Sequence, residues 1–396
     1  MSNDRRAFLK SSVLAGAAAL LPTSRVLGAN DRVRVGAIGT GGRCQYLMKV
    51  LNDAGGNEIV AVCDVYGPHR AKAKEKYAPN AKEYTDFRDV LDDKSIDAVV
   101  VGTPNHWHVP ITIAAVGAGK DVYVEKPVTH TIGEGEPLEK AVTESKRIVQ
   151  VGLQQRSWPH FQEAYSIVAG SQLGDITFIE THWYQNLLHL NDGVPEVDVS
   201  QLDWKQFVGD APAQPFDALR FTNWRWFWDF GEGSLTDLFC HWVDVAQWYM
   251  GGDTPATASA LGGNYAIHRI ECPDTISASY LYPGKYETVF RCSMIGYLEG
   301  GGLTFRGTKG LLRVDRSGYG FWPELPHYSE ALDLVKPAQE AKTNGDGTPH
   351  HMKNFLDCVR SRAIPNAPVP VGISAARTAH LGNIAFRENR IVRVTG

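Results

Sequence analysis

Three side chains carry the chemistry that this sequence suggests, namely Lys126, Asp237 and His241. Lys126 stands in the tripeptide Glu125-Lys126-Pro127 at the end of a predicted strand. Partial burial there would lower the pKa of its ammonium group until it serves as an acid or a base. The proline that follows is compatible with a cis peptide bond, which would fix the direction of the lysine. The alternative is a surface lysine that keeps its charge in water.

Asp237 and His241 belong to the stretch Leu235–Trp248, whose apolar residues follow a helical period. Together with Asp244 they are spaced four and three residues apart, so a helix would place all three on one face. An apolar helix with a single acid–histidine–acid stripe is unusual, which makes this face a candidate catalytic surface. The alternative is a hydrogen-bonded core histidine, with Asp237 as the N-terminal cap of the helix.

A glycine turn between a buried strand and a helix supplies the candidate cofactor site. The strand is Val33–Ile38, and Gly39 and Gly41 fill the first two positions of a Gly-x-Gly-x-x-Gly pattern. These glycines let the backbone turn sharply and approach a pyrophosphate, which would sit on the N-terminus of the next helix. Cys44 stands in place of the third glycine, and its small thiol is compatible with close packing of the helix on the strand.

The next buried strand ends at an acid, Asp64, which lies 25 residues after Gly39. This is near the spacing at which an acid accepts hydrogen bonds from the adenosine ribose hydroxyls. A carboxylate there would repel a 2′-phosphate, which favours NAD over NADP as the cofactor. The alternative is an ordinary strand–helix–strand unit with a surface aspartate.

The elements around these motifs alternate between strands and helices, which predicts a doubly wound parallel sheet. Ligands bind beyond the carboxyl ends of the strands in such sheets. The polar residues expected at these ends are Asn105, His106, His108, Glu125, Lys126 and Gln154. The predicted strands are 33–38, 58–64, 96–101, 121–127 and 148–153, and the predicted helices include 43–54 and 66–77.

After about residue 155 the pattern changes to one long predicted helix, 159–170, and a series of strands with turns between them. This predicts an α+β second domain with a mostly antiparallel sheet. Residues 320–350 are predicted to form a long surface loop, and the helices 351–362 and 374–388 are expected to pack back on the body. The predicted strands are 176–184, 256–268, 274–282, 286–295, 301–306 and 310–315.

The overall composition bounds the class of protein. The chain has 396 residues, of which 43% are hydrophobic and 21% charged, so two domains with sizeable cores are expected. A net charge of −4 without a long basic run argues against nucleic acid as a partner. No apolar run reaches the roughly 18 residues of a membrane span. The six cysteines lack metal-type spacing, so buried thiols and no metal site are expected.

The N-terminus indicates export. Arg5 and Arg6 precede the mild apolar run Val13–Leu21, and small residues follow near Gly28 and Ala29. This pattern is typical of a twin-arginine (Tat) signal, which predicts a periplasmic or other extracytoplasmic location. The alternative is a disordered tail with a chance Arg-Arg pair. The predicted division is a signal at 1–29, a dinucleotide-binding domain at 30–153 and a substrate domain at 154–396.

Taken together and in this order, the motifs resemble the Gfo/Idh/MocA oxidoreductase family. They are Gly39–Arg43, Thr103-Pro104-Asn105, Glu125-Lys126-Pro127 and the Asp237-x-x-x-His241-x-x-Asp244 helix. The resemblance implies a nicotinamide cofactor in the first domain and a sugar or polyol against the sheet of the second. It also implies that Lys126 and His241 handle the substrate hydroxyl proton, while Asp237 holds the substrate or tunes His241.

The resemblance and the pattern of the sequence together give a list of candidate site residues. Aromatic side chains around Arg225 and Trp226 suit stacking on sugar C–H surfaces, although a plain aromatic core is the alternative. The expected substrate-binding residues are Gln154, Arg156, Tyr184, Arg225, Trp226, Asp237 and His241. The expected cofactor-binding residues are Gly39, Thr40, Gly41, Gly42, Arg43, Asp64, Thr103, Pro104, Asn105, His108, Glu125 and Lys126.

The leading hypothesis is an exported carbohydrate oxidoreductase with a non-dissociating NAD(H), because no free NAD pool is expected outside the cytoplasm. A second hypothesis is a redox-neutral glycosidase or lyase that oxidises a sugar carbon transiently. The secreted NAD-dependent α-N-acetylgalactosaminidases resemble this chain but lack the lysine that Lys126 retains. A third is a non-catalytic sugar-binding protein. A homo-oligomer formed through the antiparallel sheet is expected, as relatives suggest.

Overall fold

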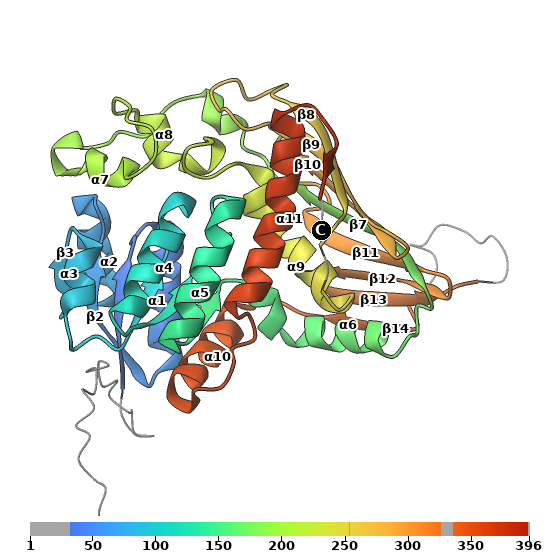
Figure 1. Ribbon diagram of the computed structural model, residues 1–396, viewed down its shortest axis with the longest axis horizontal. Coiled ribbons are helices and arrows are strands. Elements are labelled where there is room, and N and C mark those ends of the chain that lie inside the picture. The colour runs from blue at the N-terminus through green and yellow to red at the C-terminus, as the bar shows by residue number, and fades with distance from the viewer. Residues whose placement is uncertain (1–31, 253, 326–335, 395–396) are drawn as a thin grey trace, which may run out of the picture.

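The computed structural model describes residues 32–252, 254–325 and 336–394 of the chain. Figure 1 shows two layered bodies side by side, one built around a small sheet and the other around a large one. The export signal predicted for residues 1–29 lies outside the described residues. Across the described part, no helix is both long enough and apolar enough to cross a membrane.

The first body is a parallel sheet. Within the described residues its six strands follow the order β3-β2-β1-β4-β5-β6, and all of their pairings are parallel. The strands are β1 (Val33–Ile38), β2 (Asn57–Cys63), β3 (Lys82–Tyr84), β4 (Ala98–Val101), β5 (Asp121–Val124) and β6 (Val149–Val151). The helices are α1 (Gly42–Ala54), α2 (Gly67–Tyr77), α3 (Phe87–Asp92), α4 (His108–Gly117) and α5 (Gly135–Ser145).

The composition of these strands explains their burial. Every residue of β4 and β5 is buried, as expected for strands that helices cover on both faces. The strand order reverses between β1 and β4, so a crevice opens beyond their carboxyl ends. The predicted doubly wound sheet is confirmed; only the short elements β3 and α3 were missed.

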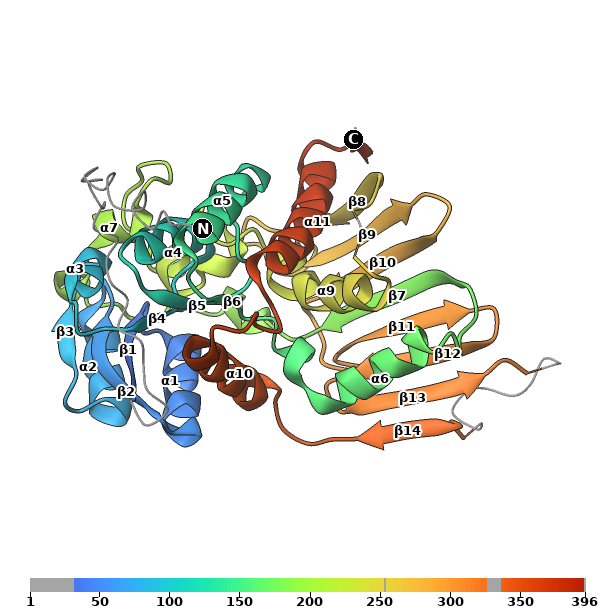
Figure 2. The same cartoon turned by 60° about the horizontal axis from the view of Figure 1, so that its bottom comes forward.

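The second body is a mixed sheet in which most neighbours are antiparallel. Its order in the described part is β14-β13-β12-β11-β7-β10-β9-β8-β15, and only β7 and β10 run parallel among these neighbours. Figure 2 shows α6, α9 and α11 on one face of this sheet. The predicted α+β domain is confirmed. The strands are β7 (Ile176–Tyr184), β8 (Thr257–Gly263), β9 (Thr275–Tyr282), β10 (Tyr286–Ser293), β11 (Gly301–Gly307), β12 (Gly310–Asp315), β13 (Gly318–Pro323), β14 (Gln339–Lys342) and β15 (Val392–Arg393), and the helices are α6 (Pro159–Ala169), α9 (Cys240–Tyr249) and α11 (Val369–Arg387).

Strand register settles two expectations in the second body. The hairpin of β9 and β10 pairs Cys292 with Ile276, and both Cys272 and Cys292 are buried free thiols, as expected for the cysteines. The prediction of a surface loop over 320–350 is wrong in part, because β13 and β14 pair there at the edge of the sheet. The edge strand β14 is mostly exposed and is held by its pairing with β13, whereas β13 buries Phe321 and also pairs with β12.

The C-terminal part of the chain returns to the first body. Helix α10 (Thr348–Ser361) buries Met352 and Phe355 in the same apolar cluster as Val33 and Leu47. The predicted boundary between 153 and 154 stays a prediction; in the structure β6 ends at Val151 and α6 begins at Pro159.

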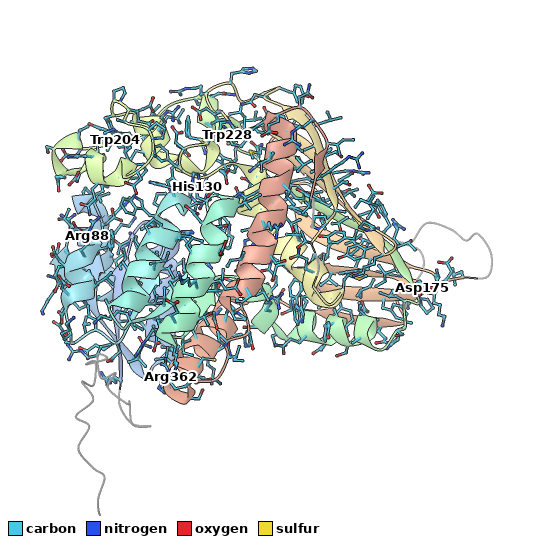
Figure 3. All side chains as sticks on the ribbon, viewed as in Figure 1. Arg88, His130, Asp175, Trp204, Trp228 and Arg362 are labelled. Carbon is cyan, nitrogen blue, oxygen red and sulfur yellow. The ribbon has the colours of Figure 1, made fainter. Side chains whose placement is uncertain are left out.

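A long irregular segment, residues 185–233, leaves β7 and lies against the first body; we call it the strap. It contains the short helices α7 (Trp204–Val208) and α8 (Ala218–Thr222). Figure 1 shows α7 and α8 beyond one end of the first sheet, and the labels of Trp204 and Trp228 in Figure 3 mark the course of the strap. Aromatic residues of the strap form an apolar cluster of their own, so it is a packed element rather than a loose loop.

Candidate active site

The glycine turn after β1 forms a cradle that only glycine allows. Gly39 has a φ of +76°, and a Cβ on it would lie 2.6 Å from the backbone nitrogen of Thr103. Gly41 caps helix α1, and a Cβ on Gly42 would meet nothing within 4 Å. Open space therefore lies before the N-terminus of a 13-residue helix, where N–H groups and the helix dipole favour an anion. The cradle fits the pyrophosphate of a dinucleotide.

Cys44, at the third position of the glycine pattern, does not disturb this packing. A Cβ on Gly102 would lie 2.8 Å from the Cβ of Cys44, so the close approach depends on a glycine in the facing loop. The thiol is buried, and burial raises the pKa of Cys44. The departure from the glycine pattern is thus compensated by Gly102.

An elongated cavity extends from the cradle toward the carboxyl end of β2. It encloses about 660 Å³ with its mouth included, within the range of small-molecule sites. The Oδ1 atom of Asp64 accepts a hydrogen bond from the backbone nitrogen of Tyr66 at 2.9 Å, and Oδ2 lies 3.4 Å from Nδ1 of His69. The lining consists of Ile38, Gly39, Gly41, Cys63, Asp64, Val65, His69, Thr85, Phe87, Gly102, Thr103, Pro104, Trp107 and Ile111, together with Gln206, Phe207, Phe221 and Trp224 of the strap. A carboxylate at one end and apolar walls elsewhere fit an adenosine.

The strap is fastened over this cavity by hydrogen bonds to the first body. The carbonyl oxygen of Phe207 accepts from Nε1 of Trp107 and from Nε2 of His106, each at 2.9 Å. Nδ2 of Asn105 donates to the carbonyl oxygen of Gly231 at 2.9 Å in a buried contact. A bound adenosine would therefore lie between the first domain and the strap.

A second cavity, of about 720 Å³ with its mouth included, lies between the two domains. It shares Gly102, Thr103 and Trp224 with the first cavity, so one extended molecule can occupy both. We call it the reaction cavity. It is lined by Arg43, Gly102, Thr103, Asn105, His108, Glu125, Lys126, Gln154, Trp183, Trp224, Arg225, Asp237, Leu238, His241 and Arg316.

Lys126 and Asp237 meet in the reaction cavity from opposite domains. The peptide bond between Lys126 and Pro127 is cis, as the sequence suggested. The Nζ of Lys126 donates to Oδ1 of Asp237 at 2.8 Å and to its carbonyl oxygen at 2.6 Å, and Nε of Arg225 lies 3.4 Å from Oδ1. Burial raises the pKa of Asp237, but the charges of Lys126 and Arg225 outweigh this and leave it lowered. Asp237 is therefore an ionised carboxylate between two cations.

His241 lies in the same cavity as a neutral imidazole. Burial lowers its pKa well below the ordinary value, and the positive charges of Lys126, Arg316 and Arg43 lower it further. Nδ1 of His241 lies 3.2 Å from Oε1 of Gln155. An amide oxygen only accepts, so Nδ1 carries the proton and Nε2 keeps the lone pair. The ring can accept a proton at Nε2.

The backbone around these residues departs from the predicted helix. Leu235–Phe239 forms a π-helical turn, and α9 begins only at Cys240. Such turns occur often at functional sites because the extra residue redirects side chains. Asp237 and His241 both line the cavity, whereas Asp244, the third member of the predicted stripe, does not.

Asp244 instead pairs with Arg156, which was expected to bind substrate. The Nε of Arg156 lies 2.8 Å from Oδ1 of Asp244, whose side chain is only 1% exposed. Burial raises the pKa of Asp244, and the charge of Arg156 counteracts the shift. Arg156 therefore supports helix α9, and its placement among substrate-binding residues is corrected.

Two further residues predicted to bind substrate also lie away from the reaction cavity. Trp226 is buried, and its carbonyl oxygen accepts from the backbone nitrogens of Glu271 and Cys272. Tyr184 stacks on His182, with ring centroids 5.4 Å apart. Successive strand residues face opposite sides of a sheet, so Tyr184 points away from the side on which its neighbour Trp183 enters the cavity.

The other predicted cofactor and substrate residues surround the two cavities. The Nε of Arg43 lies 2.7 Å from Oε1 of Glu125, and Gln154 has a buried Oε1 without a partner among the described residues. The ring nitrogens of His108 lie 2.7 Å from the carbonyl oxygen of Pro127 and 3.0 Å from that of Thr103. Burial lowers the pKa of His108, and the contacts with these two carbonyl oxygens counteract the shift. Thr40 is buried beneath the glycine turn.

Six residues of the site were not predicted: Gly102, Trp183, Trp224, Leu238 and Arg316 line the reaction cavity, and Gln155 contacts His241. Trp183 and Trp224 are the sequence neighbours of Tyr184 and Arg225, which were predicted to bind substrate. In each case the prediction was displaced by one position. Arg316 follows β12, at the start of the turn into β13, and no local pattern links it to a site more than 70 residues upstream. In the part of the chain that the structure describes, no cluster of His, Cys, Asp and Glu is arranged to hold a metal ion.

Known proteins share both domains. A family model described as "Oxidoreductase family, NAD-binding Rossmann fold" matches residues 33–153, and one described as "GFO/IDH/MocA C-terminal domain" matches 161–313. The inositol 2-dehydrogenase of Salmonella typhimurium is 30% identical over 153 residues, which are 38% of this chain and 44% of that protein. The α-N-acetylgalactosaminidase of Tannerella forsythia is 34% identical over 163 residues, 34% of this chain and 35% of that protein. The chain thus spans less than half the length of these relatives.

A solved structure shows how far the likeness in fold extends. A levoglucosan dehydrogenase in complex with NADH and levoglucosan superimposes with a TM-score of 0.72 at 17% identity, over 92% of this chain and all of that one. The matching domains occur in the same order as the two bodies described above. The chain therefore belongs to the Gfo/Idh/MocA family of oxidoreductases.

Proposed function

We propose that the protein transfers a hydride between a hydroxyl-bearing carbon of a sugar or polyol and a bound nicotinamide, as an exported NAD(H)-dependent oxidoreductase. The observation that carries this proposal is the meeting of Lys126, Asp237 and His241 in a cavity that adjoins the dinucleotide cradle. The residues of the glycine turn and of the adenosine cavity fit the cofactor. When bound, the cofactor supplies the hydride acceptor or donor.

The protein's own contribution is to position the substrate and to manage one proton. His241, neutral and with its lone pair on Nε2, accepts the proton of the reacting hydroxyl during oxidation. Asp237 holds Lys126 in place. Lys126 donates a hydrogen bond to the oxygen of the reacting hydroxyl. Trp183 and Trp224 form apolar walls of the cavity beside the sugar. These roles reverse when the substrate is reduced.

The proposed cofactor is NAD(H), retained through catalysis. Asp64 supports NAD over NADP because its carboxylate faces the adenosine cavity and would repel a 2′-phosphate. The strap supports retention because Phe207 is hydrogen-bonded over the same cavity. Retention also agrees with export of a folded protein through the signal predicted at residues 1–29, since the bound cofactor would then be regenerated on the protein.

An assembly of identical chains through the large sheet remains part of the proposal. The face of the sheet that the helices leave uncovered presents Leu261 and Leu281, which are 74% and 48% exposed. Apolar side chains exposed on adjacent strands support a contact between copies of this chain.

A second candidate function is a redox-neutral glycosidase that oxidises a sugar carbon only transiently. The 34% identity with the Tannerella enzyme favours it, since that relative is an α-N-acetylgalactosaminidase. Lys126 favours net oxidoreduction, because its ammonium group would act on the hydroxyl oxygen of the sugar rather than on the departing group of a glycoside.

One experiment separates the two candidates. The purified protein is incubated with free sugars and polyols and with matched aryl glycosides, and both keto products and released phenol are measured. Oxidoreduction predicts keto products from free sugars and no phenol. Release of phenol without accumulation of a keto sugar would instead establish the glycosidase.

A further inference from the structure

Arg316 brings a positive charge from the second domain into the reaction cavity. It stands at the turn from β12 to β13, and its guanidinium carbon lies 4.7 Å from the centre of the Trp183 ring. The Trp183 ring is in turn nearly parallel to that of His241, with centroids 6.0 Å apart. Arg316 therefore belongs to the wall that carries the proposed substrate-handling residues, not to the cradle at α1.

The other cations of the cavity already have carboxylate partners. Arg43 pairs with Glu125 at 2.7 Å, and Lys126 and Arg225 both face Asp237. Arg316 has no carboxylate oxygen within 4.0 Å among the described residues, and its Nε is buried without a hydrogen-bond partner there. A guanidinium stays charged when buried, so this cation is left uncompensated at a cost in solvation.

The acids that act on Arg316 electrostatically, Asp346 and Asp237, are committed elsewhere, since Asp237 already faces Lys126 and Arg225. Asp346 favours the charged form of Arg316 from a distance, while its oxygens accept hydrogen bonds from the nitrogen and the hydroxyl of Thr348 at 2.8–2.9 Å. Burial lowers the pKa of Arg316, which is the sign of an environment that lacks a close counter-charge. The missing charge must come from a ligand.

This inference rests on the proposed function and names the class of its substrate. We propose that the substrate is a sugar acid whose carboxylate binds Arg316, above the ring of Trp183. A carboxylate fits because it brings a negative charge to Arg316 and matches the planar fork of its guanidinium.

The test compares binding of acids and neutral sugars to the protein with its bound cofactor. Titration calorimetry with D-glucuronate, D-galacturonate and D-mannuronate is set against the corresponding hexoses and against D-glucose 6-phosphate. We expect at least one acid to bind about tenfold or more tightly than its hexose, because hydrogen bonds to charged groups are stronger than those between neutral groups.

The substitution R316Q is expected to abolish this preference, so that each acid binds no more tightly than its hexose. R313Q, at an exposed position of the preceding strand β12, serves as the matched control and should keep the preference. Unchanged cofactor content and thermal unfolding of R316Q show that the fold is intact. If no acid binds more tightly than its hexose, if R316Q keeps the preference, or if the phosphate binds more tightly than every acid, the proposal is wrong.

The same titrations distinguish this inference from the proposed function. Hexose-dependent changes in the absorbance of the bound nicotinamide, without any preference for acids, would retain hydride transfer and reject the sugar acid. Tight binding of an acid that depends on Arg316, without any redox change under all conditions, would retain the binding site and reject hydride transfer.

Discussion

The Nζ of Lys126 lies 2.8 Å from Oδ1 of Asp237, and this ion pair joins the loop after β5 to the π-helical turn before α9. The two side chains come from different domains, so the second domain orients the lysine that the first domain supplies. The position of the proposed proton-handling group thus depends on correct docking of the domains.

Replacement of Lys126 by alanine should lower the turnover number by about 10²- to 10⁴-fold, the usual contribution of a positioned acid or base. The measurement is the steady-state rate at saturating substrate. Lys94→Ala, at an exposed position of the first domain, should leave the rate unchanged. A Lys126→Ala rate within twofold of the parent would remove the proposed role.

The substitutions Asp237→Asn and Asp244→Asn should separate catalysis from stability, although both acids lie on one stretch of chain. Asp237→Asn removes the charge that holds Lys126, so turnover should fall. The unfolding temperature should change less than in Asp244→Asn, because Asp237 lines an open cavity and is 14% exposed, against 1% for Asp244. Asp244→Asn leaves Arg156 without its buried partner and should cost about 3–5 kcal/mol of unfolding free energy. Rates and urea unfolding curves of both variants check this, and a reversed pattern would contradict the assignment.

Replacement of Gly39 by alanine should abolish cofactor retention. The new Cβ would lie 2.6 Å from the nitrogen of Thr103, at a φ that side chains avoid. Gly117→Ala is the matched control, because its Cβ would meet nothing within 4 Å in a helix. That variant should retain the cofactor and gain up to about 1 kcal/mol of stability. Nucleotide absorbance of the dialysed proteins is the measurement.

Loosening the strap should speed cofactor loss without touching the cofactor site. Trp204 stacks on Phe207 with centroids 5.0 Å apart but does not line the adenosine cavity. Trp204→Ala should accelerate release of the bound nucleotide about tenfold or more, which corresponds to 1.4 kcal/mol. Tyr265→Ala, at a 69% exposed position of the second domain, should behave as the parent does. Equal release rates for both variants would show that the strap is not what retains the cofactor.

Stability should fall in mild acid because of buried neutral histidines. Burial lowers the pKa of His351 to about 4. The unfolded chain binds a proton at His351 below about pH 6.5, whereas the folded chain does so only near pH 4. The free energy of unfolding is therefore highest above about pH 6.5 and decreases as the pH falls toward 4. His351 alone should account for a loss of about 2 kcal/mol of unfolding free energy between pH 7 and pH 5. His351→Gln should reduce the loss by this amount in urea unfolding, whereas the exposed His268→Gln should not.

Hydrophobic patterns and turn residues in the sequence were sufficient to predict most of the fold. Buried strands such as Val33–Ile38 and the hairpin that pairs Cys292 with Ile276 follow from local hydrophobicity and turn residues. The strands β13 and β14 lacked such a signal, and the mostly exposed β14 is held by its pairing with β13. The strap was seen only as an aromatic-rich stretch, because nothing local shows that it packs on the other domain.

The candidate site was predictable where motifs mark the ends of strands, as at Gly39 and Lys126. The site was not predictable where a shift of one position along the chain changes the direction of a side chain. The π-helical turn separates Asp237 from the face of Asp244, and the alternation of β7 selects Trp183 over Tyr184. Arg316 reaches the site through tertiary packing alone.

The most direct test of the central claim follows the near-ultraviolet absorbance of reduced nicotinamide on the purified, dialysed protein after rapid mixing with a panel of sugars, sugar acids and polyols. We predict a substrate-dependent rise or fall of this absorbance that is slowed at least a hundredfold in Lys126→Ala. The absence of any change with every member of the panel, in protein shown to hold the nucleotide, would contradict hydride transfer at this site.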